Sequence, residues 1–282
     1  MRKYKRKTRR MRRRKHKGHS RRQRGGSSDL KEITMGMLSW KSPLTIRNTL
    51  DSYKKNGLLT MVKPMLYFQE RSPQDDALAK EYGITDVMGE SSTNTGIIGG
   101  MIEMIQATKT KYFIFAECDF ELVNDEATTK KILSEAMKLM EEKDIQLVRL
   151  RDKKRPGEPL GSRAFAPVPD EELPNFTFDA GFPYKIEVVM FPGDIQPDKA
   201  FPGLFERIDY ETPWYKTTSE HAPWSNNIFI ARTDFLKEKL LPLLEKNRDM
   251  PSTSMERYLI ENLNGYNVAA GNGLFMHKRV DR

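Results

Sequence analysis

The sequence has a single cysteine, Cys118, in 282 residues. One thiol cannot close an intrachain disulfide, which excludes a disulfide-stapled scaffold and fits a reducing compartment. No second cysteine is present to help bind zinc, and no adjacent histidine could activate the thiol, so a nucleophilic role is disfavoured. Because Cys118 lies between two acids of a predicted strand, we expect its side chain to point away from them, into the core.

Acidic residues are absent before Asp29. Residues 1–24 instead carry 15 Lys and Arg, so a formal charge of +9 for the whole chain leaves −6 for the remainder. Such a segment repels itself and cannot bury apolar surface, which predicts a disordered polybasic tail over residues 1–28. Three roles stay open for it: a solvated extension, nuclear targeting or nucleic-acid contact through residues 2–24, and attraction to anionic lipid.

Long apolar runs are also absent. No segment is long and apolar enough to span a bilayer, and the basic start lacks the apolar region of a secretory signal. We therefore expect a protein that has no membrane span, is not secreted, and is cytoplasmic or nuclear.

The body of the chain alternates strand-like and helix-like segments. Strands are predicted at 32–40, 61–68, 111–117 and 145–150, and residues 84–90 are predicted to form a short strand or an extended link. Predicted helices between them begin at Pro43 with Ser42 as the cap, at 73, at Asn94 or Thr95, and at 126. This alternation predicts an α/β, Rossmann-like fold: a doubly wound, mostly parallel sheet with helices on both faces.

The pattern changes after residue 150. Residues 151–183 are rich in proline, glycine and charge and are predicted to form a long loop. Further strands are predicted at 185–191 and 226–231, helices at about 233–247 and 253–263, and a short strand pair at 266–277. Since no polar linker separates the halves 29–150 and 151–282, we expect one domain over 29–282.

Acids end the most apolar predicted strand. The stretch KYFIFAECDFELVND, residues 111–125, leads into Glu117, Asp119 and Glu121. Carboxylates crowded at a buried edge repel one another, so either a divalent cation or a basic residue is expected nearby. Glu117 and Asp119 face the same way on an extended chain, and their oxygens suit Mg²⁺ or Mn²⁺. The residue types alone leave open that these acids merely begin a loop.

Three segments carry a family resemblance: ITMGMLSWKSPLTIRNTLDSYKKNGL, MLYFQERSPQDDALAKEYGI and NTGIIGGMIEMIQATKTKYFIFAECDF. In order and spacing they resemble the family 2 glycosyltransferases of the GT-A fold, which bind nucleotide-diphosphate sugars. They are similar to that family's opening strand and helix, its second strand with an acidic turn, and its Asn-x-Gly helix with the strand before the Asp-x-Asp metal motif. The chain also resembles glycosyltransferase-like proteins of large DNA viruses, which implies a host cell or a virion as its location.

The resemblance assigns roles in the first half, the nucleotide-sugar-binding half. Glu117 and Asp119 stand at the Asp-x-Asp motif, with Glu in place of the first Asp, and would hold Mn²⁺ or Mg²⁺. Gln69 and Glu70 stand where the family has an acid that touches the base, which leaves the base preference open. The residues expected to contact the nucleotide are Ser39, Trp40, Glu70 and Asn94; for Trp40 a place in the core is the alternative.

In the second half, the acceptor and catalytic half, TSMERYLIENLNGYNVAAGNGLFMH resembles the family's late helix and closing strand. The resemblance makes Glu256 the base that deprotonates the acceptor hydroxyl, with Glu220 and Asp249 as substitutes. The family's paired Glu-Asp is missing here, so an exposed acid favoured by the helix dipole is the alternative. His277 matches a histidine that completes metal coordination in a number of GT-A enzymes; a structural role is its alternative.

Two further regions are candidates for substrate contact. Arg149 and Arg151 lie on a strand end that leads into a basic loop including Arg163, and arginine suits bidentate phosphate contacts, although a solvated loop is the simpler interpretation. The stretch 210–227 gathers Trp214, Tyr215 and Trp224, whose rings could stack on sugars of an acceptor.

The sequence thus predicts a metal-dependent, inverting, non-processive glycosyltransferase. It would move a sugar from a nucleotide-diphosphate donor to a hydroxyl of a glycan or protein acceptor. A sugar-nucleotide pyrophosphorylase is the closest alternative, but LSWKSP lacks the Gly-rich basic loop expected after its first strand. The other alternative is a nucleic-acid-binding or virion structural protein whose transferase-like domain is inactive.

Overall fold

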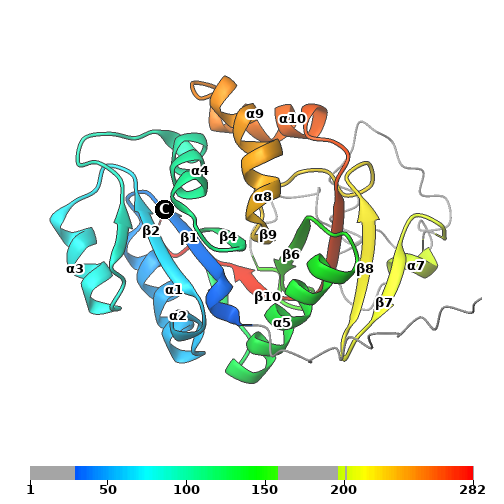
Figure 1. Ribbon diagram of the computed structural model, residues 1–282. Helices are drawn as coiled ribbons and strands as arrows, with labels where there is room; N and C mark the ends of the chain where they lie inside the picture. Colours follow the sequence, from blue (N-terminus) through cyan, green and yellow to red (C-terminus); the bar gives the residue numbers. More distant parts are fainter. Residues whose placement is uncertain (1–28, 158–195, 201, 282) are drawn as a thin grey trace, which may run out of the picture.

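The computed structural model describes residues 29–157, 196–200 and 202–281 (Figure 1). The predictions for the tail 1–28, the strand 185–191 and most of the loop 151–183, Arg163 included, lie outside the described residues. Among the described helices, none has the length and apolar character needed to cross a membrane.

One sheet holds the strands of both halves of the described chain. Its spatial order is β3 (Asp86–Met88), β2 (Lys63–Phe68), β1 (Ile33–Ser39), β4 (Tyr112–Glu117), β9 (Phe229–Arg232), β6 (Leu147–Arg151), β10 (Asn267–His277), β8 (Pro213–Thr218) and β7 (Glu206–Asp209). The short β5 (Phe120–Leu122) pairs with β10 beside this row. Strands β3, β2, β1, β4, β6 and β10 run in one direction, whereas β9, β8 and β5 run against it. The mostly parallel sheet predicted from the sequence is confirmed.

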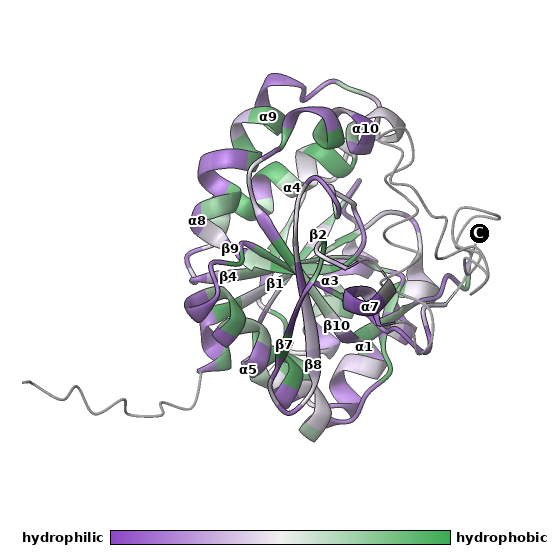
Figure 2. Cartoon of the chain, turned by 90° about the vertical axis from the view of Figure 1, so that its right-hand side faces the viewer, coloured by the Kyte–Doolittle hydropathy of each residue, from purple (hydrophilic) through white to green (hydrophobic). Residues whose placement is uncertain are grey.

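Helices cover both faces of the sheet. Side chains alternate along β4, so Ile114 and Ala116 face one core while Phe113 and Phe115 face the other. The first core is covered by α1 (Pro43–Lys55), α2 (Leu58–Met61), α3 (Pro73–Glu81) and α5 (Glu126–Glu142). The second is covered by α4 (Gly96–Ala107), α8 (Thr233–Phe235), α9 (Leu241–Lys246) and α10 (Ser252–Asn262). Figure 2 shows apolar residues along the sheet and on the helix surfaces that face it.

The second half differs from its prediction in three places. A hairpin of β7 and β8 occupies residues that were not predicted as strands, and α7 (Pro197–Ala200) precedes it. The predicted strand pair 266–277 is a single strand, β10, whose pairing with β6 shifts register between Ala270 and Phe275. The predicted helix 233–247 is interrupted by a π-helical turn, Leu236–Leu240, just before Pro242, which lacks the N–H that a regular helix would use.

Candidate functional site

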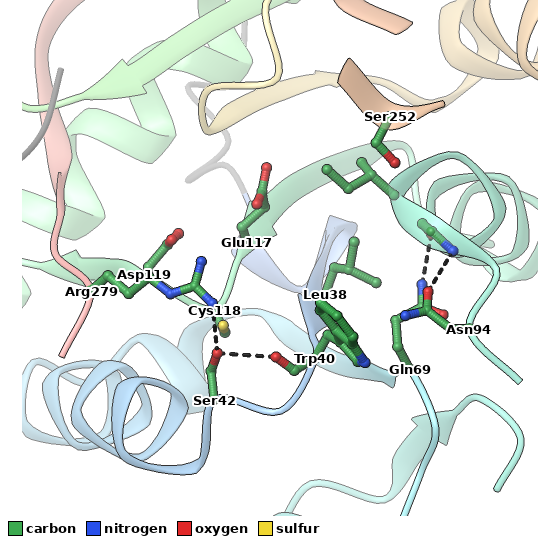
Figure 3. A pocket seen from close by; sticks show the side chains of 12 residues that line it. Leu38, Trp40, Ser42, Gln69, Asn94, Glu117, Cys118, Asp119, Ser252 and Arg279 are labelled. Carbon is green, nitrogen blue, oxygen red and sulfur yellow. Dashed lines mark hydrogen bonds between the residues drawn. The ribbon is translucent and has the colours of Figure 1, made fainter. Parts of the chain in front are cut away.

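A cavity of about 330 Å³ opens at the carboxyl ends of β1, β2 and β4 (Figure 3). These strands are neighbours in a parallel set, so the loops that follow them meet at one edge of the sheet. The rest of the cavity wall is formed by the start of α4, the start of α10 and the segment after β10. The lining residues are Leu38, Trp40, Ser42, Gln69, Asn94, Gly96, Ile97, Glu117, Cys118, Asp119, Ser252 and Arg279.

Both acids that end β4 border this cavity. The Asp119 side chain is buried, and its Oδ2 lies 3.1 Å from Nε2 of His277, the last residue of β10. Its other oxygen, Oδ1, is buried without a hydrogen-bond partner in the described part of the chain. In Figure 3, Glu117 points into the cavity toward the side where Ser252 lies, and Asp119 lies beside Arg279. A buried carboxylate oxygen without a donor is a ready ligand for a cation.

The carboxyl of Glu117 has a raised pKa. Its burial raises the pKa of the carboxyl to about 7, and the charge of Asp119 adds to this effect. Glu256 raises the pKa of Glu117 further, whereas the charges of His277 and Arg279 lower it. Glu117 is thus held in surroundings that disfavour its charged form unless positive charge is added.

The structure brings together only part of the set of metal ligands predicted from the sequence, Glu117, Asp119 and His277. His277 and Asp119 are in contact, and Glu117 and Asp119 share one cavity. The described residues contain no group of three His, Cys, Asp or Glu side chains arranged to hold a metal ion. The two carboxylates suit Mg²⁺ or Mn²⁺, which commonly take only one or two protein carboxylates together with substrate phosphates and water. Coordination by His277 stays a prediction.

Trp40 lies at the surface, beside the cavity, and not in the core. Its side chain is 48% exposed, and its Nε1 donates to Oε1 of Glu70 at 3.3 Å. The ammonium of Lys41 lies 2.5 Å from the other oxygen of Glu70, and this ion pair lowers the pKa of Glu70. Lys41 and Glu70 both have positive φ, 47° and 52°, a conformation that non-glycine residues rarely adopt. The ion pair of Lys41 and Glu70 and the hydrogen bond from Trp40 to Glu70 therefore hold the ends of β1 and β2 together. Both members of the ion pair have a strained backbone conformation.

Of Asn94 and Ser39, which were also predicted to contact the nucleotide, only Asn94 lines the cavity. Asn94 lines the cavity, and its Oδ1 accepts a hydrogen bond from the N–H of Gly96 at the start of α4. Ser39 is buried outside the lining, and its carbonyl accepts from the N–H of Gln69. Gln69, not Ser39, reaches the cavity; its amide donates to the carbonyl of Gly96 and accepts from the N–H of Thr95.

Arg149 and Arg151 do not line the cavity. Nη2 of Arg149 donates to the carbonyl of Pro223 at 2.5 Å, and Nη1 of Arg151 donates to Oδ1 of Asn227 at 2.7 Å. Desolvation lowers the pKa of each guanidinium to about 10. Both arginines contact the loop before β9, and the phosphate contact expected of them from the sequence stays a prediction.

Glu256 lies in the first turn of α10 and is held by the loop before β9. Its Oε1 accepts from the N–H of Asn226 at 2.7 Å and from the hydroxyl of Ser225 at 3.1 Å. It does not line the cavity, but it is close enough for its charge to raise the pKa of Glu117. The structure therefore brings this acid to the same end of the sheet as the acids of β4.

The expectation that three aromatic residues contact the acceptor is wrong. Trp214, Tyr215 and Trp224 are at most 6% exposed, so they are core residues and present no faces to an acceptor sugar. The indole N–H of Trp214 donates to Glu135, a buried carboxylate, at 2.7 Å. Cys118 is buried and packs in the core with Ile114 and Ala116, as the sequence predicted, and it also borders the cavity; its burial raises the pKa of the thiol to about 12.

Arg279 was missed by the sequence analysis. It lies in the segment after β10, and its Nη2 donates to Oγ of Ser42 at 3.2 Å. The sequence signal was present, because Lys278 and Arg279 directly follow the candidate metal ligand His277. A basic pair at a predicted strand end indicates positive charge near the acids that the same sheet edge carries.

Comparison with known proteins gives structural matches only. No protein-family model matches the sequence, and no curated protein matches it in sequence. The solved structure of S. aureus TarS 1-349 matches with a TM-score of 0.51 at 12% identity, over 87% of this chain and 60% of that chain. Its complex with UDP matches with a TM-score of 0.50 at 12% identity, over 86% of this chain and 59% of that chain.

A third solved structure matches with a lower TM-score. Glucosyl-3-phosphoglycerate synthase from Mycobacterium tuberculosis, in complex with Mn²⁺, UDP and glucosyl-3-phosphoglycerate, matches with a TM-score of 0.44 at 12% identity, over 91% of this chain and 77% of that chain. The present chain spans about 60% of the length of TarS 1-349. At these identities the likeness shows the fold: the chain has the GT-A-like α/β fold that the sequence predicted.

Proposed function

We propose that this chain is a metal-dependent glycosyltransferase that moves a sugar from a nucleoside-diphosphate donor to a hydroxyl acceptor, with inversion and one sugar per encounter. The observation that carries the proposal is the Oδ1 atom of Asp119, buried beside Glu117 in a cavity and without a donor in the described part of the chain. This cavity lies at the carboxyl ends of parallel strands, where α/β folds bind nucleotides. The match to a fold that holds UDP in the TarS complex supports the same ligand class.

Glu117 and Asp119 would hold Mn²⁺ or Mg²⁺, and His277 would support Asp119 through their 3.1 Å contact. A bound ion would neutralise the charge that builds on the departing nucleoside diphosphate. The exposed indole of Trp40 would stack on the base. Asn94 would lie close to the nucleotide, where its side chain accepts a hydrogen bond from the N–H of Gly96 at the start of α4.

Glu256 would act as the general base. Its carboxylate is oriented by Asn226 and Ser225, which keeps it in place to accept the proton of the acceptor hydroxyl as that oxygen attacks the anomeric carbon. A single displacement inverts the configuration and needs no nucleophile from the enzyme. The high pKa of Cys118 agrees with this scheme, because it keeps the thiol at the site protonated.

The test is turnover of nucleotide sugars by the full chain. Purified protein is incubated with a panel of UDP- and GDP-sugars in Mn²⁺ or in EDTA, and release of nucleoside diphosphate is measured. We expect release with at least one donor that depends on Mn²⁺ and is lost in Asp119→Asn but kept in Glu206→Gln, a surface control on β7.

Other outcomes favour the alternatives. Formation of pyrophosphate from a nucleoside triphosphate and a sugar phosphate would indicate a pyrophosphorylase. Absence of turnover with every donor, together with tight and salt-sensitive DNA binding, would favour a nucleic-acid-binding protein with an inactive domain. The location in a cell or virion and a viral origin stay predictions.

A further inference from the structure

The segment 278–281, which follows β10, packs on the start of α1. The N–H of Lys278 donates to the carbonyl of Asp119 at 2.6 Å, and the N–H of Val280 donates to Oγ1 of Thr45 at 3.0 Å. The segment thus links the end of β10 to both the acidic end of β4 and the first turn of α1. It lies at the edge of the sheet where the cavity opens.

Asp281 caps α1 from 236 residues away in sequence. Ser42 stands at the cap position, but its hydroxyl donates to the carbonyl of Trp40 and caps no N–H of the helix. Asp281 accepts instead from the N–H of Leu44 at 2.9 Å, from the N–H of Thr45 at 3.2 Å and from the Thr45 hydroxyl. Burial alone would raise the pKa of Asp281, but these hydrogen bonds bring the pKa below its ordinary value. The helix N-terminus and the carboxylate therefore stabilise each other.

This arrangement leaves Ser42 available to hold Arg279. Nη2 of Arg279 donates to Oγ of Ser42, and Nε donates to the backbone carbonyl of Asp281 at 3.1 Å. In the described part of the chain, Arg279 forms no ion pair with a carboxylate, although it lines a cavity that contains two. A guanidinium that is fixed by two hydrogen bonds and faces the cavity suits a diphosphate, which it can bind through two parallel hydrogen bonds.

We propose that Asp281 is a positioning residue: by capping α1 it fixes segment 278–281 so that Arg279 contacts the diphosphate of the donor. The inference rests on the proposed function, since it concerns the same cavity. It gives Asp281 a role in donor affinity, although Asp281 itself does not line the cavity.

The test compares two helix caps in the full chain. Asp281→Ala removes the cap of α1, and Asp125→Ala removes the equivalent carboxylate cap of α5, where Oδ1 of Asp125 accepts from the N–H of Thr128 at 2.8 Å. Binding of UDP with Mn²⁺ is measured by calorimetry. We expect the dissociation constant for UDP to rise about tenfold in Asp281→Ala, as for loss of a charge-assisted hydrogen bond, and to stay unchanged in Asp125→Ala. Asp281→Asn should restore most of the affinity, because asparagine caps helices about as well as aspartate.

A double-mutant cycle separates positioning from general stability. In an Arg279→Ala background, Asp281→Ala should weaken UDP binding no further, and the affinity for uridine, followed by NMR titration, should be the same in all variants. Additive losses, or an equal loss for uridine, would mean that Asp281 only stabilises the fold and would overturn the inference. Undiminished UDP binding by Asp281→Ala would overturn it too. A wild-type chain that binds no nucleoside diphosphate would instead refute the proposed function, and the inference with it.

Discussion

Replacing Glu117 by glutamine should make the metal-free protein more stable at alkaline pH. The carboxyl of Glu117 is half-buried near Asp119, and desolvation raises its pKa from 4.5 to about 7. Glutamine has the shape of the protonated acid but never ionises. The substitution therefore removes an electrostatic penalty that the wild-type fold carries once Glu117 is charged.

The size and sign of the effect follow from proton linkage. The folded state binds the Glu117 proton more tightly than the unfolded state, so the stability of the wild type is highest below pH 4.5 and falls as the pH rises toward 7. Each pKa unit corresponds to about 1.4 kcal/mol, so the gap between 4.5 and 7 is worth about 3 kcal/mol above pH 7. For a domain of this size that is a rise in Tm of about 6–12 °C in Glu117→Gln.

The assay is urea unfolding in EDTA at pH 5 and pH 8, for wild type, Glu117→Gln and the surface control Glu206→Gln. We expect the advantage of Glu117→Gln over wild type to be about 1 kcal/mol or less at pH 5 and about 3 kcal/mol at pH 8. Mn²⁺ should reverse the order at pH 8, because it binds the charged carboxylate and stabilises only the wild type. An advantage that does not change with pH, or equal stabilisation of both by Mn²⁺, would refute this account of the site.

Three other predictions concern binding and packing. Trp40→Ala should weaken UDP binding in calorimetry by about 1–3 kcal/mol with little change in Tm, since the ring is 48% exposed, and Trp40→Phe should retain most of the affinity. Glu135→Ala should lower the free energy of unfolding, measured in urea, by about 3 kcal/mol, because the Trp214 indole and two neighbouring donors lose their acceptor. Gly36→Ala should lower it by about 1–3 kcal/mol, because the new Cβ would lie 2.7 Å from the ring of Phe113; a change near zero would contradict the close packing.

Much of the first half was predictable because its signals are local. Helix α5 begins at the predicted residue 126, where Asp125 caps its start, and Ile132, Leu133 and Ala136 mark its buried side. The acids after β4 were placed at the sheet edge because parallel strands end together. Such patterns depend on residues close in sequence, so they need no knowledge of the tertiary fold.

The parts that were not predictable depend on contacts between distant residues. The cap of α1 by Asp281 and the place of Arg279 beside Ser42 each join residues more than 200 positions apart. Trp214 was misjudged for a similar reason: a polar neighbourhood in sequence suggested exposure, but the buried carboxylate of Glu135 satisfies its N–H. The composition of a segment cannot show that a polar side chain on one helix or strand forms a hydrogen bond with a side chain on another.

Several features that cost stability meet at the same edge of the sheet. Glu117 is disfavoured in its charged form, Asp119 has a buried oxygen without a donor in the described residues, and Lys41 and Glu70 have strained backbones. Among the described residues, the other non-glycine residue with positive φ is Asp144, which lies in the turn between α5 and β6, before the start of a parallel strand and therefore away from this edge. Strain, a raised pKa and a carboxylate oxygen without a donor each have structural explanations singly, but selection for stability alone gives no reason for them to gather at one edge of the sheet. A dication would offset the charge of Glu117 and take the Asp119 oxygen as a ligand, which is why we propose the function for this site.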